Sequence, residues 1–273
     1  GTALMLDVLI NSKNSIKKII LSSSRAVYGE GMYKCKDQGV IFPSSRNDED
    51  LQDGKYDFIS QKSKSKLIPI PTKENSHISP TSIYALTKYN QEQILFIAAN
   101  NLNIDVAVLR YQNVFGPGQS LSNPYTGILS VFSTRILNGN DIEIYEDGMQ
   151  SRDFVYIDDV VNATLLVLKK SNLKNQVYNV GSGEPITVLK VAQKLKELYN
   201  LTASITISNK YRRGDIRHNF ADLSLINQEL GFVNEFSFDS GLLNFVEWVK
   251  KQDIQDDKYD SSIQEMIQKG IMK

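Results

Sequence analysis

The chain has 273 residues, enough to bury a substantial core as one large domain or two small ones. Its 31 basic and 31 acidic residues balance, so the charge points to neither a nucleic acid nor an anionic membrane as a partner. No apolar run approaches the ~20 residues that span a bilayer. The single cysteine, Cys35, excludes an internal disulfide and argues against a cysteine-based metal site. These features predict a soluble cytoplasmic protein without a resident metal, in which Cys35 is an incidental loop thiol.

The first elements of the chain are predicted to be a helix and a buried strand. Residues 1–13 have the apolar spacing of a helix, and the apolar run 18–21 suits a strand buried on both faces of a parallel sheet. A polar cluster follows at residues 22–29, and α/β folds place their chemistry at the carboxyl ends of parallel strands. Ser24 could donate a hydrogen bond there to a substrate oxygen, unless the serines only turn the chain.

Residues 31–79 show no clear periodicity and are predicted to form a long surface insertion. A loop of this length is either functional or mobile, and the sequence leaves both readings open. The insertion contains a run of lysines at residues 61–66. We interpret this run as a solvated loop rather than as a binding patch.

The segment 79–94 predicts a helix that carries a candidate general base. A Pro-Thr-Ser sequence marks its start, with Ser79 or Thr81 as the capping residue. Tyr84 and Lys88 are four positions apart, so both side chains emerge on one face of the helix. A lysine ammonium beside a phenol favours the phenolate, which lowers the pKa of the tyrosine toward neutrality and makes it a usable base.

A second buried strand is predicted at residues 104–110. It delivers Asn113 at its carboxyl end, where the side-chain amide can both donate and accept hydrogen bonds. Gly116 and Gly118 follow and allow the backbone a tight path near a ligand. An apolar helix is then predicted over residues 128–137.

Arginines in the second half of the chain could hold a phosphate. Arg152 lies among polar turn residues and aromatics and could present its guanidinium to a phosphate, or it could form a merely structural pair with Asp153 or Asp158. Residues 211–218 place three arginines beside a glycine and an aspartate, which could hold an anion and a sugar diol together or form a basic solvated turn. We interpret His218 as a hydrogen-bonded structural residue.

The remaining elements are shorter. The periodicity of the sequence predicts strands at residues 142–145, 177–180 and 204–207, helices at 160–168, 187–199 and 238–249, and a polar tail at 252–273.

Six motifs in chain order resemble those of the extended short-chain dehydrogenase/reductase family. They are Ser-Ser-Ser-x-x-Val-Tyr-Gly, Tyr-x-x-x-Lys, Leu-Arg-Tyr-x-Asn-Val-x-Gly-Pro, Ser-Arg-Asp-Phe-Val-Tyr-Ile-Asp-Asp, Tyr-Asn-Val-Gly-Ser-Gly and Arg-x-Gly-Asp. The similarity runs from residue 1 to about residue 250, apart from the insertion. Within this family the chain is most similar to the nucleotide-sugar epimerases, and residues 109–130 look most like the dTDP-L-rhamnose 4-epimerase type.

The resemblance implies a Rossmann-like, doubly wound parallel sheet with a smaller α/β domain that binds the nucleotide sugar. Residues 1–115 would belong to the NAD-binding domain, residues 116–252 mainly to the sugar-binding domain, and residues 253–273 to a tail. The family opens with a strand, a Gly-x-x-Gly-x-x-Gly turn and a helix that receive the cofactor pyrophosphate. No such pattern occurs here, so we expect the first sheet strands to be missing and the chain not to bind NAD tightly by itself.

The resemblance also assigns site residues. Ser24, Tyr84 and Lys88 match the catalytic trio of the family. Tyr84, Lys88 and Tyr111 would contact NAD. The nucleotide sugar would be held by Ser24, Arg25, Asn113, Asn123, Arg152, Arg212 and Asp215.

The implied activity is NAD-dependent 4-epimerisation of a nucleotide-diphosphate sugar, either dTDP-L-rhamnose or a UDP-hexose. Tyr84 would take the proton from the C4 hydroxyl while hydride leaves C4 for NAD⁺, and the 4-keto sugar would rotate and receive the hydride on its other face. The alternatives are a nucleotide-sugar reductase or 4,6-dehydratase, and a truncated, non-catalytic nucleotide-sugar-binding remnant. Dehydration is disfavoured because Arg25 and Ala26 occupy the positions of the dehydratase Asp-Glu pair. The family also implies a homodimer, formed through the helix at residues 1–13 and the helix that carries Tyr84.

Overall fold

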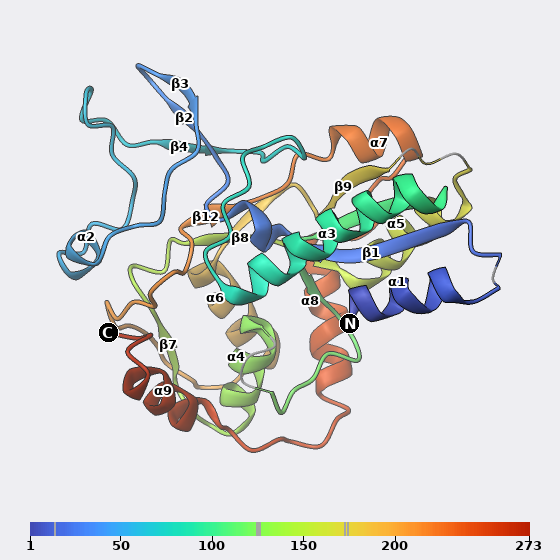
Figure 1. Ribbon diagram of the computed structural model, residues 1–273. Coiled ribbons are helices and arrows are strands. Elements are labelled where there is room, and N and C mark those ends of the chain that lie inside the picture. Colours follow the sequence, from blue (N-terminus) through green and yellow to red (C-terminus); the bar gives the residue numbers. More distant parts are fainter. Residues whose placement is uncertain (14, 124–126, 172, 174) are drawn as a thin grey trace.

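The computed structural model of the protein describes residues 1–13, 15–123, 127–171, 173 and 175–273 (Figure 1). Its centre is a three-stranded parallel sheet in the order β1-β5-β9. The three strands are β1 (Lys18–Ser24), β5 (Asp105–Tyr111) and β9 (Gln176–Val180). Within the described part of the chain β1 is an edge strand. Because the three strands are parallel, their carboxyl ends meet at one edge of the sheet.

Helices cover both faces of this sheet, which explains the apolar run of β5. Val106 and Val108 point to one face, where they pack with α1 and α3, while Ala107 and Leu109 point to the other, where they pack with α5 and α7. All four side chains are fully buried. An alternating strand with apolar residues on both sides is typical of a parallel sheet between two helical layers. The covering helices are α1 (Thr2–Asn11), α3 (Ile83–Leu102), α5 (Ile157–Lys169) and α7 (Ser224–Leu230).

Helix α3 begins later than the sequence predicted. Its cap is Ser82, whose hydroxyl oxygen accepts the Ala85 N–H at 3.1 Å, and not Ser79 or Thr81. The Thr81 hydroxyl instead donates to the Gly214 carbonyl at 3.5 Å. The residue three positions before the donating amide therefore caps the helix, as capping geometry requires.

The second half of the chain forms a smaller α/β region with its own core. Aromatic rings dominate this core, and Phe115 lies within 6.5 Å, centroid to centroid, of Phe154, Tyr156, Phe238 and Phe245. The elements of this region are β6 (Asn113–Phe115), α4 (Ile128–Leu137), β7 (Ile142–Ile144), β8 (Ser151–Tyr156), β10 (Pro185–Thr187), α6 (Val188–Tyr199), β11 (Ile205–Ile207), β12 (His218–Asn219) and α8 (Phe238–Val249).

The segment around Arg152 is a strand and not a turn. All six residues of β8 are buried, and the strand pairs with β6, β10 and β12. The sequence did not predict a buried strand here, because Ser151, Arg152 and Asp153 are polar residues that are typical of a surface turn. In the fold each of these side chains has a hydrogen-bond partner, which allows a polar strand in the interior.

The insertion at residues 31–79 is structured. It forms an antiparallel sheet in the order β3-β2-β4 and one short helix. These elements are β2 (Met32–Cys35), β3 (Gly39–Ile41), β4 (Ile68–Ile70) and α2 (Asp48–Gln52). Cys35 is a buried strand residue rather than a loop thiol, and its Sγ donates to Asp37 at 3.0 Å. The lysine run is solvated, and Lys66 pairs at the surface with Asp57 at 2.6 Å.

The polar tail contains a helix, α9 (Tyr259–Gln268), and folds back onto the smaller α/β region. Met272 forms an isolated antiparallel bridge with Arg212. Figure 1 shows α9 beside β7, close to the labelled C-terminus. Across the described ranges, no helix combines the length and the apolar character that a membrane span requires.

Candidate active site

A cavity of about 760 Å³ opens where the carboxyl ends of β1 and β5 face the first turns of α3. It is lined by every predicted site residue except Asn123, namely Ser24, Arg25, Tyr84, Lys88, Tyr111, Asn113, Arg152, Arg212 and Asp215. Asn123 is not among the described residues that line the cavity. Residues 124–126, which follow it, lie outside the described residues. The fold therefore brings residues from five separate motifs to one hollow.

Tyr84 and Lys88 lie one turn apart on α3 and face the cavity together. The Lys88 ammonium is 5.9 Å from the centroid of the Tyr84 ring and donates to the Ser22 carbonyl at 2.8 Å. The Tyr84 side chain is 56% exposed, so its phenol can reach a ligand in the cavity. Lys88 is tied to the end of β1, which holds the cation at a fixed place beside the phenol.

Ser24 is the last residue of β1 and caps the short 3₁₀ helix at Arg25–Tyr28. Its hydroxyl oxygen accepts the Ala26 N–H at 3.2 Å. Because a hydroxyl has one proton and two lone pairs, this contact leaves the Ser24 proton available for an oxygen in the cavity. Ser24 therefore both turns the chain and faces the site.

Arg152 and Asp215 form the ionic centre of the cavity. The Arg152 Nη2 donates to Asp215 at 2.7 Å, and the guanidinium also donates to the carbonyls of Ser151, Ile216 and Arg217. Burial alone would raise the pKa of Asp215, but the surrounding guanidinium groups hold the pKa below its usual range. Arg152 is thus paired with Asp215 and not with either aspartate proposed from the sequence.

Arg25, which is half-buried, adds a second guanidinium at this centre. Burial, together with the neighbouring charge of Arg152, lowers its pKa to about 10. At neutral pH Arg25 therefore remains a cation and cannot serve as a general acid–base catalyst. The excess of positive charge in this part of the cavity suits an anionic group such as a phosphate.

Asp153 organises the turn that follows β9. Its carboxylate accepts the N–H groups of Ser182, Gly183 and Ala221 at 2.6, 3.0 and 3.1 Å. Burial raises the pKa of Asp153 although these hydrogen bonds oppose the change. A side chain at Gly181 would place its Cβ 2.5 Å from the Asp153 carboxylate, so the glycine is needed for this close approach. His218 is likewise structural, since its Nδ1 lies 2.8 Å from the Ser151 hydroxyl.

Gln112 is a candidate ligand contact that sequence reasoning missed. It lines the cavity between Tyr111 and Asn113, it is 5% exposed, and neither its amide nitrogen nor its amide oxygen has a hydrogen-bond partner. The side-chain oxygen of Asn113 is also buried without a partner. Leaving such a group unsatisfied costs about 1–3 kcal/mol, which a ligand in the cavity would offset. The sequence offered no signal for Gln112 beyond its place between two predicted residues.

The insertion contributes a buried ionic network beside the site. Arg46 donates to Glu146 and to the Asp215 carbonyl, the latter at 2.9 Å. Its Nε lies 3.7 Å from Glu30, and burial raises the pKa of Glu30 to about 7 although Arg46 opposes the change. Arg217, 1% exposed, donates to Asp57 and Asp147 on either side of the same network. The insertion is therefore anchored to the segment that carries Asp215.

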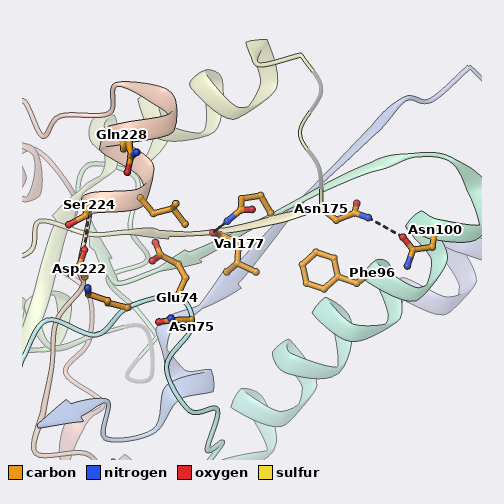
Figure 2. Close-up of a pocket in the computed structure, with 12 residues that line it drawn as sticks. Glu74, Asn75, Phe96, Asn100, Asn175, Val177, Asp222, Ser224 and Gln228 are labelled. Atoms are coloured by element: carbon orange, nitrogen blue, oxygen red, sulfur yellow. Dashed lines mark hydrogen bonds between the residues drawn. The ribbon is translucent and has the colours of Figure 1, made fainter. Parts of the chain in front are cut away.

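A second hollow of about 620 Å³ lies between α3, β9 and α7 (Figure 2). Much of its polar lining already serves the fold. The Glu74 carboxylate accepts the Asn179 N–H at 2.8 Å, and the Asn175 amide donates to Asn100 at 3.3 Å. This hollow contains none of the residues predicted to act on a substrate.

The fold and the position of the main cavity are typical of α/β proteins in which a ligand binds at the carboxyl edge of a parallel sheet. Residues 1–181 match the NAD-dependent epimerase/dehydratase family, and the chain belongs to that family. This finding confirms the family predicted from the six motifs.

Relatives of established or assigned activity are similar over much of the chain. The chain is 32% identical to the dTDP-L-rhamnose 4-epimerase of Burkholderia thailandensis, over 92% of this chain and 68% of that protein. It is also 32% identical to the putative UDP-glucose 4-epimerase of Methanocaldococcus jannaschii, over 66% of this chain and 57% of that protein. The crystal structure of UDP-glucose 4-epimerase from Thermotoga maritima with UDP-glucose has 30% identity and a TM-score of 0.70, covering 92% and 68% of the two chains. The chain thus spans between 57% and 68% of the lengths of these three proteins.

Proposed function

We propose that this chain carries the sugar-binding and acid–base machinery of an NAD-dependent nucleotide-sugar 4-epimerase. One observation carries the proposal: the serine, tyrosine and lysine of the predicted trio line the same cavity as the Arg152–Asp215 ionic centre. A nucleotide sugar needs both, because its diphosphate requires cations and its reacting hydroxyl requires a base. The membership in the NAD-dependent epimerase/dehydratase family and the similarity to 4-epimerases support it.

The chain's own residues account for the proton chemistry. Tyr84 takes the proton from the hydroxyl at C4 of the sugar, and Lys88 stabilises the phenolate electrostatically. Ser24 donates a hydrogen bond to the same oxygen as it becomes a carbonyl. When bound, NAD⁺ supplies the redox chemistry by accepting a hydride from C4 and returning it. Rotation of the 4-keto sugar between the two transfers exposes its other face, after which Tyr84 returns the proton and C4 is inverted.

The residues beside the trio fit the nicotinamide riboside part of the cofactor. Lys88 and Tyr84 can bond ribose hydroxyls, and Tyr111 supplies an aromatic surface. The unpartnered amide of Gln112 matches the donors and acceptors of a carboxamide. On the substrate side, Arg152 and Arg212 hold the diphosphate. The substrate is a dTDP- or UDP-linked hexose, with dTDP-L-rhamnose favoured by the similarity over residues 109–130.

The surface of the first helical layer supports a homodimer. Helices α1 and α3 lie side by side, joined by a hydrogen bond of 3.0 Å from Gln91 to Thr2. Both leave large apolar side chains exposed, which is typical of a surface that another protein covers. These side chains are Leu4, Met5, Val8, Ile10, Ile83, Leu86, Ile94 and Ile97.

The proposal is tested by incubating the protein with NAD⁺ at saturating concentration and either dTDP-L-rhamnose or UDP-glucose and identifying the products by NMR. We expect the C4 epimer, and we expect Tyr84→Phe to lower the rate by about 100-fold or more. Tyr89→Phe, on the same helix but outside the cavity lining, is the matched control and should retain the rate. A lasting keto or deoxy sugar would indicate a reductase or dehydratase. Binding of the nucleotide sugar without any turnover would indicate a non-catalytic binding protein.

A further inference from the structure

The C-terminal helix α9 forms one wall of the main cavity. Tyr259, Ser262, Ile263 and Met266 line it, together with residues of α4 and β7. Tyr259 and Ile263 are less than 9% exposed and pack with Met272 in a small apolar cluster. The tail therefore contributes to the binding site and is not an appendage.

Several contacts fix this wall in place. The Tyr259 hydroxyl lies 2.5 Å from the hydroxyl of Tyr145, just after β7. The Arg135 guanidinium stacks 4.2 Å above the Tyr259 ring and pairs with Asp257 and Asp260, both at 3.2 Å. Such a set of contacts holds the aromatic ring in one orientation. The ring and the apolar residues one turn along the helix thus present a preformed surface.

The segment 212–215 connects this wall to the catalytic end of the cavity. At one end, Arg212 pairs with Met272 of the tail. At the other, the Gly214 carbonyl accepts from Thr81, just before α3, and Asp215 pairs with Arg152. The phosphate-binding arginines therefore lie between α3 and α9.

If the proposed function holds, the arrangement of α3, the arginines and α9 places the base of the nucleotide sugar at α9. With the sugar at Tyr84 and the diphosphate at Arg152 and Arg212, the nucleoside extends toward the tail. A pyrimidine base has two flat apolar faces and suits an aromatic and aliphatic wall. We propose that Tyr259, Ile263 and Met266 form the surface against which the base of the nucleotide sugar packs.

The proposal is tested by calorimetric titration of the protein with UDP, dTDP and inorganic pyrophosphate, which lacks a base. We expect Met266→Ala and Ile263→Ala together to weaken UDP and dTDP binding by about tenfold and to leave the pyrophosphate affinity unchanged. The control is Ile267→Ala, an exposed residue of the same helix outside the cavity lining. An equal loss for all three ligands would overturn the proposal, because α9 would then act only by holding Arg212. So would unchanged UDP and dTDP affinity.

A photolabelling experiment keeps the test independent of how well the variants fold. 5-Azido-UDP carries its reactive group on the base, and irradiation of the unmodified protein should label the tryptic peptide 259–269. Labelling confined to any other peptide would overturn the placement of the base. If the unmodified protein binds neither UDP nor dTDP, the proposed function itself fails and the base site fails with it. Binding with normal affinity but labelling elsewhere refutes the base site alone.

Discussion

Arg46 and Glu146 are separated by 100 positions in the chain, yet both terminal nitrogens of Arg46 donate to the Glu146 carboxylate at 2.8 Å. Both side chains are less than 5% exposed. This bidentate pair joins the insertion to the loop after β7, and the same guanidinium reaches the Asp215 carbonyl. The insertion therefore belongs to the architecture of the site.

The first prediction concerns this buried pair. Arg46→Ala removes the cation beside Glu30 and the bidentate partner of Glu146, which keeps only its contact with Arg217 at 3.1 Å. Because both carboxylates are buried, we expect the free energy of unfolding to fall by about 3–5 kcal/mol. Urea denaturation followed by tryptophan fluorescence measures this change. Lys55→Ala is the matched control, because Lys55 forms a solvent-exposed pair with Asp53 and its loss should be undetectable. Similar effects of the two substitutions would contradict an anchoring role for Arg46.

The second prediction is a pH dependence that originates at Glu30. Burial raises the pKa of Glu30 from 4.5 to about 7, so the folded protein binds this proton more tightly than the unfolded chain does. The contribution to stability is complete below about pH 4.5 and is lost as the pH rises through about 7. Its slope is at most about 1.4 kcal/mol per pH unit.

Glu30→Gln removes this titration. We expect the stability difference, wild type minus Glu30→Gln, to fall between pH 5 and pH 7, as measured by urea denaturation at closely spaced pH values. A difference that stays flat across this range would show that Glu30 keeps an ordinary pKa in the folded protein.

The third prediction separates a ligand contact from a structural amide. Gln112→Leu removes two unpartnered polar atoms, so the protein without ligand should become equally stable or more stable, by about 1 kcal/mol. Its affinity for NAD or the nucleotide sugar should fall. Asn179→Leu is the contrasting variant, because the Asn179 amide bonds Thr72 and Tyr28 and its loss should destabilise the fold. Thermal unfolding with and without ligand measures both effects, and a loss of stability in Gln112→Leu would refute the assignment.

The fourth prediction tests the proposed dimer. Val8 of α1 and Ile97 of α3 are 57% and 67% exposed, so Val8→Glu with Ile97→Glu should cost little stability in the monomer. We expect light scattering during gel filtration to show a dimer for the wild type and a monomer for the double variant. Leu243→Glu, at an exposed site on α8, should leave the dimer intact. A wild-type monomer at high concentration would refute the proposal.

The sequence by itself determined the family, the central strands and the helix that carries Tyr84 and Lys88. These features follow from local sequence patterns. Apolar runs predict buried strands, and a spacing of four positions places two side chains on one face of a helix. The motifs also indicated the residues now found around one cavity. Such signals lie within a few consecutive positions and need no knowledge of distant contacts.

Only the tertiary structure decided which charges meet. Arg152 pairs with Asp215, 63 positions away, and not with its neighbour Asp153, because β8 and β12 run side by side. Contacts between distant segments also explain why the polar strand β8 is buried and why the insertion folds although its sequence shows no periodicity. The apolar residues of α9 are few, so no sequence pattern predicts that this helix lines the cavity. Their position depends on strand pairing and ion pairs between segments far apart in the chain, which local sequence does not encode.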